Sequence, residues 1–242
     1  MKYIVLFLSF FLSLQSYASV GKVSALNGEA LIERGQEKIT AAIGSDIKNQ
    51  DTIVTLDQTK MQMIFIDKTV ITLGKNTRFD VSSYSFNESG QPETEFSLAK
   101  GFMKSVTGKI GKLAPERFKV KTKDATIGIR GTTFTLETNE QFTRLTTFKG
   151  ATYYQDNRTQ TIYEVPKNKT LLFNHLTQEV EISDLTLKNR RLGGQDDSPT
   201  SIQDSLKEAE DAQQSNEQNE QMDQIEEPVD LDKITYDSLT YS

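Results

Sequence analysis

The 242-residue sequence contains no cysteine and no tryptophan, and it has a single histidine, His175. Without cysteine, the folded chain cannot depend on disulfides and must be held by its hydrophobic core. Zinc sites of the usual kinds and Ser-His or Cys-His nucleophile systems need more histidine or cysteine than this chain contains. We therefore expect no metal, no cofactor and no catalytic residue, and we expect His175 to lie in a turn between strands.

Long apolar runs are absent except at the start of the sequence. Lys2 precedes an apolar run over residues 3–14, and small side chains follow at Ser16 and Ala18. This pattern is typical of a secretory signal peptide over residues 1–18, with cleavage after Ala18. The run is shorter than the roughly 20 apolar residues that span a bilayer. We expect a periplasmic or secreted chain with no transmembrane segment after cleavage.

Charge is unevenly distributed along the chain. Residues 195–242 contain 14 acidic and 2 basic side chains, whereas residues 19–194 contain 20 acidic and 25 basic ones. The last 50 residues are rich in Glu, Gln, Asp, Asn and Ser and cannot bury enough apolar surface to offset the entropy of ordering. We predict a disordered acidic tail over 193–242. Residues 233–241 regain apolar side chains and are either a frayed end or a short strand that docks on a sheet edge.

Residues 19–192 carry the pattern of an all-β domain, because short alternating segments are separated by Gly, Asn, Asp or Pro. The pattern predicts a single antiparallel or rolled β domain with a C-terminal β extension, built as a sandwich, a barrel or a short β-solenoid. Periodicity alone does not choose among these three forms. The predicted strands are 22–26, 30–34, 52–55, 60–66, 70–73, 78–86, 95–100, 102–106, 118–123, 132–138, 143–148, 151–155, 160–165, 169–173 and 179–182.

A lysine-rich stretch lies in the middle of this domain. Residues 100–130 contain nine basic and two acidic side chains. Alternation along FKVKTK places Lys119, Lys121 and Lys123 on one solvated face. This face is suited to an anionic partner such as lipid headgroups, an acidic polysaccharide or the acidic tail, and export argues against nucleic acid. In the alternative interpretation, the lysines only keep a solvated face and protect sheet edges from pairing.

The stretch ATIGIRGTTFTLE, residues 125–137, has two glycines inside an alternating apolar pattern. Glycine permits backbone angles and close approaches that other residues resist. We expect Gly128 and Gly131 to mark a sharp corner or bulge between two core strands. Thr132 and Phe134 then continue the second strand, with Phe134 in the core.

Arg130 stands between these glycines. We expect its guanidinium to lie along the corner and to donate to carbonyls that the bend leaves unpaired, or to a carboxylate such as Asp124. A ligand-binding arginine is the alternative. The structural role predicts that Arg130→Ala lowers the melting temperature, whereas an unchanged melting temperature with lost partner binding would favour the ligand role.

The same stretch resembles the most recognisable motif of the FecR domain family, A-x-[IV]-G-[IV]-R-G-T-x-F. Upstream, a G-D-like step at residues 44–46, a second at 51–52 and the L-G-x-N-T pattern at 73–77 are similar to an earlier family segment, so the resemblance extends over about 22–149. Regulators of this family carry the domain outside the inner membrane, joined through a transmembrane helix to a cytoplasmic segment that controls a sigma factor. This chain resembles the free-standing exported members instead.

These features together predict a non-catalytic exported module that recognises a protein or polymer of the cell envelope through sheet edges and the lysine-rich face. Two alternatives remain open from the sequence. One is a carbohydrate-active enzyme with a pair of carboxylates in a cleft. The other is a structural component of an envelope assembly.

Overall fold

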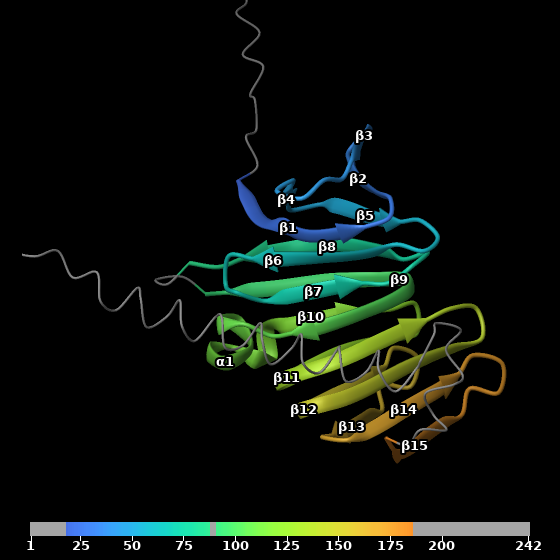
Figure 1. The fold of residues 1–242 in the computed structure, drawn as a ribbon. Helices are drawn as coiled ribbons and strands as arrows, with labels where there is room; N and C mark the ends of the chain where they lie inside the picture. The colour runs from blue at the N-terminus through green and yellow to red at the C-terminus, as the bar shows by residue number, and fades with distance from the viewer. Residues whose placement is uncertain (1–17, 88–90, 186–242) are drawn as a thin grey trace, which may run out of the picture. The chain divides into compact units, whose positions relative to one another are not determined.

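A computed structural model of the chain describes residues 18–87 and 91–185, all of which fall in the first of two units, Met1–Gly193 (Figure 1). Residues 1–17 of the predicted signal peptide lie outside the described residues. The predicted acidic tail over 193–242 and its segment 233–241 also lie outside them.

The described residues form fifteen strands, one five-residue helix and one 3-10 turn, and the all-β prediction is confirmed. The elements are β1 (Ser19–Asn27), β2 (Ala30–Arg34), β3 (Glu37–Thr40), β4 (Asp46–Lys48), β5 (Asp51–Thr55), β6 (Lys60–Phe65), β7 (Val70–Leu73), β8 (Arg78–Ser85), β9 (Glu93–Val106), α1 (Lys109–Leu113), η1 (Pro115–Arg117), β10 (Phe118–Lys121), β11 (Ala125–Thr138), β12 (Phe142–Asp156), β13 (Ile162–Pro166), β14 (Lys169–Asn174) and β15 (Val180–Asp184).

All fifteen strands belong to one open hydrogen-bonded sheet that folds over into two layers. Layer A has the order β3-β2-β5-β8-β9-β10-β11-β12-β13. Layer B has the order β4-β1-β6-β7-β9-β11-β12-β14-β15. In Figure 1 the stack of strands runs from β2 and β3 at the top to β14 and β15 at the bottom. The long strands β9, β11 and β12 contribute to both layers, so the domain is a rolled, sandwich-like sheet.

Each of the three long strands bends where it passes from one layer to the other. A glycine with positive φ lies at each bend: Gly101 (+99°), Gly131 (+58°) and Gly150 (+72°). The strand pairs predicted at 95–100 and 102–106, and at 143–148 and 151–155, are therefore halves of single bent strands. A glycine that interrupts the alternation marks a corner here, and the hydrogen-bonded pairing continues on both sides of it.

One neighbouring pair of strands, β9 and β10, is parallel, a detail that the prediction of an antiparallel or rolled β domain did not specify. Parallel neighbours need a crossover connection, because a tight hairpin reverses the chain direction. The helix α1 and the turn η1 supply this crossover from the end of β9 in layer B to the start of β10 in layer A. Within the described residues, no helix combines the length and apolar content needed to cross a membrane.

The side chains between the two layers form one hydrophobic core. Along β10, Phe118 and Val120 are fully buried while the residues between and after them are exposed. The ring of Phe65 in layer B lies 5.0 Å, centroid to centroid, from the rings of Tyr84 and Phe96 in layer A. Burial of apolar surface between the layers is the main term that stabilises this arrangement.

Strands β3 and β4 and the first half of β11 were not predicted. Strand β3 is exposed at three of its four residues, so it lacks the alternation that reveals a half-buried strand. Strand β4 has only three residues, which is too short for a pattern to be recognised. The first half of β11, from Ala125 to Arg130, was missed because its glycines were read as breaks.

Candidate functional site

The motif at residues 125–137 lies in one bent strand, β11, whose corner is at Gly131. The φ angle of Gly131 is +58°, and the pairing with β12 shifts in register between Arg130 and Thr133. Residues with a side chain rarely adopt such φ values. The corner is also crowded, because a Cβ on Gly150 of β12 would lie 2.1 Å from the Gly131 carbonyl oxygen. Backbone geometry therefore requires glycine at both positions.

Polar backbone groups at the corner are satisfied by Thr107, which directly follows β9. The Thr132 N–H donates to Thr107 Oγ1 at 3.0 Å, and the Thr132 carbonyl accepts from the Thr107 N–H at 3.1 Å. Phe134, two residues further on, is fully buried in the core. The corner is thus held by the backbone of Thr132 and by the packing of Phe134.

Arg130 plays no part in this arrangement. Its side chain is exposed on the outer face of layer A, next to the buried Ile129. In the part of the chain that the structure describes, the Arg130 guanidinium has no hydrogen-bond or ion-pair partner. The expected contact with Asp124 is not formed, because that carboxylate accepts hydrogen bonds from Thr143 and Tyr154 instead.

Gly128 lies in regular pairing and is not at the corner. It is opposite Lys119 of β10 on one side and Tyr153 of β12 on the other. Its φ is not positive, and a Cβ built there would meet only the Tyr153 Cβ, at the ordinary contact distance of 4.0 Å. Neither conformation nor space requires a glycine at this position. Its missing side chain leaves an open place on the outer face between Lys119 and Tyr153.

The outer surface around this open place carries several cations, and we name it the basic face. Strand alternation directs its side chains away from the core, since the residues between them are buried. Lys121 forms an ion pair with Glu95 of β9 at 2.7 Å, and Glu164 of β13 pairs opposite Tyr153. The basic face consists of Lys119, Lys121, Gly128, Arg130 and Tyr153, with the exposed Lys123 in the turn after β10.

The nine basic residues of 100–130 do not form one continuous surface. Lys104 lies in layer B, where it is 7% exposed. Lys109 and Lys112 lie on α1 in the crossover. Only the part from β10 to Arg130 gathers on the outside of layer A. The sequence stretch predicted a stripe, but the bend in β9 separates its first members from its last ones.

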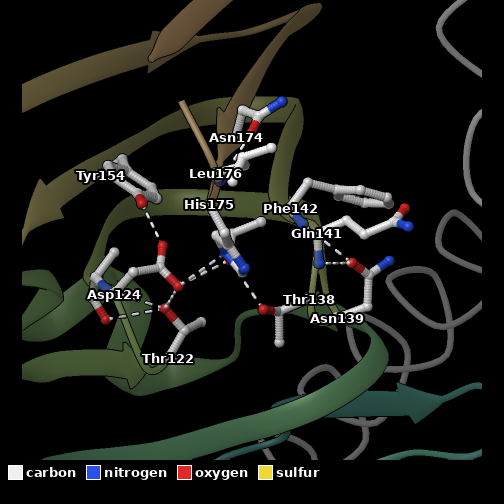
Figure 2. Close-up of polar contacts among 12 residues, drawn as sticks. Thr122, Asp124, Thr138, Asn139, Gln141, Phe142, Tyr154, Asn174, His175 and Leu176 are labelled. Carbon is white, nitrogen blue, oxygen red and sulfur yellow. Dashed lines mark hydrogen bonds and ion pairs between the residues drawn. The ribbon is translucent and has the colours of Figure 1, made fainter. Parts of the chain in front are cut away.

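A second polar cluster lies on the core side of the same strands, around Asp124 in the turn between β10 and β11 (Figure 2). Thr143 Oγ1 donates to Asp124 Oδ1 at 3.0 Å, and the Tyr154 hydroxyl donates to Oδ2. His175, in the turn after β14, places Nε2 3.3 Å from Asp124 Oδ1 and 3.1 Å from Thr143 Oγ1. This cluster joins β12 to two turns that are far apart in sequence.

The geometry of the Asp124 cluster is that of a structural link. In a nucleophile relay, the carboxylate and the nucleophile bind opposite nitrogens of the imidazole. Here Asp124 and Thr143 both face Nε2 of His175, and Thr143 is fully buried. Burial, followed by the hydrogen bond and charge of Asp124, raises the pKa of Tyr154 well above its usual value. Tyr154 therefore stays protonated and donates to Asp124 across the pH range of cells.

Residues 51–152 match the FecR protein family. This match confirms the predicted resemblance, and it includes the bent motif strand and the whole of β10. A comparison with curated proteins found no match. Two crystal structures, at 2.50 and 1.65 Å resolution, of a candidate anti-sigma factor from Parabacteroides distasonis are similar to this chain. Each has 14% sequence identity and a TM-score of 0.45, over 55% of this chain and 59% of that chain, so the match spans less than two thirds of their length.

The FecR segment contains a fully buried acid, Asp67, that sequence reasoning missed. Its carboxylate accepts hydrogen bonds from the Tyr84 hydroxyl at 2.7 Å, from the Thr69 N–H at 2.9 Å and hydroxyl at 2.8 Å, and from the Ile110 N–H at 3.1 Å. The Lys109 N–H also donates to the Asp67 carbonyl at 2.8 Å. Asp67 therefore fixes the start of α1 to the turn between β6 and β7.

A second buried acid, Asp51, stands at the first residue of the FecR segment. Arg34 donates through Nε and Nη2 to its two carboxylate oxygens, each at 2.7 Å, and the Lys48 N–H donates at 2.8 Å. The hydrogen bond to Asp51 raises the pKa of Arg34 above its ordinary value. The sequence places Asp51 at the start of a strand, but it gives no sign that Arg34 is its partner.

Acidic and histidine side chains do not gather into a metal-binding set in the described part of the chain, where no group of three or more His, Cys, Asp or Glu is suitably placed. The acids of the FecR segment that are buried bind groups of the protein itself. On the basic face, Lys121 is paired with Glu95, whereas Lys119 and Arg130 have no hydrogen-bond or ion-pair partner among the described residues.

Proposed function

We propose that this chain is an exported, non-enzymatic interaction module that recognises an anionic component of the cell envelope through the basic face. One observation carries the proposal. Arg130 and Lys119 are exposed on the same face of layer A and have no hydrogen-bond or ion-pair partner among the described residues. A side chain that the fold does not use, in the middle of a family motif, is available to a partner.

The buried acids accept hydrogen bonds from other groups of the protein, which supports a non-enzymatic role. A carboxylate pair that hydrolyses a glycosidic bond must be able to reach the substrate. Asp51 and Asp67 are fully buried and bind Arg34, Tyr84 and backbone N–H groups. Asp124 is engaged in the same way by Tyr154 and its neighbours. These acids serve the stability of the sheet.

The proposal that the protein is exported depends on the predicted signal peptide, and cleavage of this peptide can be tested directly. N-terminal sequencing of the mature protein, purified from its own cells, should begin at Ser19. Recovery of a chain that retains Lys2 would contradict cleavage.

Binding through exposed charges weakens with ionic strength, because salt screens interactions beyond about 10 Å at 0.1 M. We expect the purified protein to retain envelope material in a pull-down at low salt and to release it at high salt. Joint replacement of Lys119, Lys121 and Lys123 by glutamine should reduce this retention. Lys38→Gln, on β3 at the far end of layer A, serves as the matched control. Retention that is insensitive both to salt and to the triple replacement would reject the basic face.

A further inference from the structure

We propose that the basic face binds a carboxylate-bearing polysaccharide, with Tyr153 as a platform for a sugar ring and with Arg130 and Lys119 as the carboxylate-binding groups. This inference rests on the proposed function and specifies the chemistry of its partner. It uses two residues, Gly128 and Tyr153, to which the fold assigns no other task.

Gly128 of β11 and Tyr153 of β12 are direct cross-strand neighbours on the outer face. Cross-strand neighbours on one face of a sheet have Cβ atoms about 5 Å apart, so a side chain at position 128 would cover the flank of the Tyr153 ring. Gly128 leaves that flank open, although a Cβ would fit there without strain. Tyr153 is half-buried, and the glycine leaves one flank of its ring uncovered by β11. The exposed Ile162 of β13 lies on the same outer face, opposite Gln155.

Two cations, Lys119 and Arg130, are neighbours of Gly128 on the same outer face. Lys119 is directly across Gly128 from Tyr153, and Arg130 follows Gly128 by two residues on the same face of β11. Diagonal neighbours on a sheet lie about 7–8 Å apart. A planar guanidinium binds a carboxylate through two parallel hydrogen bonds, and an ammonium binds it as a point charge. Two anion-binding groups therefore border one aromatic platform.

The other residues around Tyr153 distinguish a polysaccharide from other anions. Further along β11 and β12, Thr126 and Gln155 present hydroxyl and amide groups, held by Asn157 and Gln160 at 3.0 and 2.9 Å. Glu164 of β13 lies directly across from Tyr153 on its other side, so the carboxylates of the polymer have to approach from the side of Lys119 and Arg130. A sugar polymer offers hydroxyls to such groups and an apolar C–H face to an aromatic ring. A protein hot spot would instead need a cluster of apolar and aromatic anchors. The composition of the basic face favours the polysaccharide.

The test is a titration of the full chain with polygalacturonate at low salt. Neutral dextran, inorganic polyphosphate and phosphatidylglycerol vesicles are the comparison ligands. We expect polygalacturonate to bind and dextran to bind at least tenfold more weakly. Tyr153→Ala and Arg130→Gln should each weaken polygalacturonate binding by about tenfold or more, while Lys38→Gln leaves it unchanged.

Gly128→Val separates this proposal from a loss of folding. Valine suits a strand and should keep or raise the stability of the sheet, yet its side chain would fill the open place beside Tyr153. We expect unchanged or higher resistance to urea together with loss of polygalacturonate binding. Full binding of polygalacturonate by a stable Gly128→Val protein would contradict the proposal that Tyr153 binds a sugar ring.

The outcomes also separate the two proposals. Equal binding of polygalacturonate, polyphosphate and vesicles, weakened by Arg130→Gln but unaffected by Tyr153→Ala or Gly128→Val, would overturn the polysaccharide inference and leave the anionic-partner function standing. If neither Arg130→Gln nor the triple lysine replacement weakens binding, both the anionic-partner function and the polysaccharide inference are contradicted.

Discussion

The acids of the interior and the cations of the basic face differ in what surrounds them. Asp67 accepts four hydrogen bonds, and Asp51 accepts three. Arg130 and Lys119, by contrast, have no such partner in the described residues. A buried polar group is costly unless it is paired, so the fold determines the surroundings of the acids. An exposed cation costs little, so the fold does not determine what Arg130 and Lys119 contact, and both are available to the partner that we propose.

The largest effect on stability is expected from replacing Asp67. Asp67→Ala would leave the buried Tyr84 hydroxyl proton and the Ile110 N–H without an acceptor, each at a cost of about 1–3 kcal/mol, although the residue 67 N–H would still donate to the Tyr84 hydroxyl. We expect a loss of roughly 3 kcal/mol or more in the free energy of unfolding, measured by urea denaturation. Asp57→Ala is the control, since Asp57 is exposed and its carboxylate, among the described residues, accepts only a 3.3 Å hydrogen bond from Asn76. Equal losses in the two variants would contradict the role given to Asp67.

The two motif glycines offer a matched pair. Gly131→Ala forces a side chain into a positive φ, which costs about 1–2 kcal/mol. Gly128→Ala meets no steric obstacle and should be neutral or stabilising by up to about 1 kcal/mol, because alanine restricts the unfolded chain. Thermal unfolding of both variants gives the comparison. A Gly128→Ala protein that is as unstable as Gly131→Ala would show that the fold needs both glycines.

Asp156 lies at the end of β12, in the turn beside the basic face. We expect this acid to stabilise the fold, as the acids of the interior do. Burial alone would raise its pKa, but N–H groups of Thr159 and Arg158 outweigh this effect and lower the pKa below its ordinary 3.8. Its stabilisation is therefore complete above pH 3.8 and is lost as the pH falls through the lowered value. We expect Asp156→Ala to cost about 1 kcal/mol at neutral pH.

The pH dependence of that variant is the check. The difference in unfolding free energy between Asp156→Ala and the unaltered protein should stay constant from pH 7 to about pH 5 and shrink below the ordinary carboxyl pKa. A difference that grows on acidification would contradict the sign of the pKa shift.

The smallest stability effect is expected at Arg130. Because its side chain is exposed and unpaired, Arg130→Ala should change the unfolding free energy by less than about 0.5 kcal/mol. This reverses the expectation from sequence, which gave Arg130 a role in holding the corner. A loss above 1 kcal/mol in thermal or urea unfolding would restore the structural role.

The sequence predicted the parts of this molecule that follow from local pattern. Alternation identified the core residues of β10, and glycine at position 131 indicated a corner in the chain. Pattern could not tell that the chain on the two sides of Gly101 or Gly150 belongs to one strand, since pairing partners are distant in sequence. The parallel position of β10 was hidden for the same reason.

The site was predictable to a similar degree. Lys119 and Lys121 could be assigned to one face of β10 by their period of two, whereas Lys123 lies in the bend after that strand. The pairing of Asp67 with Tyr84 and of Asp51 with Arg34 could not be deduced, because these contacts join separate strands and turns. The position of Tyr153 beside Gly128 depends on the register between β11 and β12, which no local pattern specifies.

The most direct test of the account is amide chemical-shift mapping of the isotope-labelled full chain during titration with oligogalacturonate. We predict that the largest shift changes occur at Lys119, Gly128, Arg130 and Tyr153, with small changes around Asp67. Changes concentrated on the outer face of layer B or on the β2–β3 hairpin, with none at these four residues, would contradict the claim that the basic face is where this protein meets its partner.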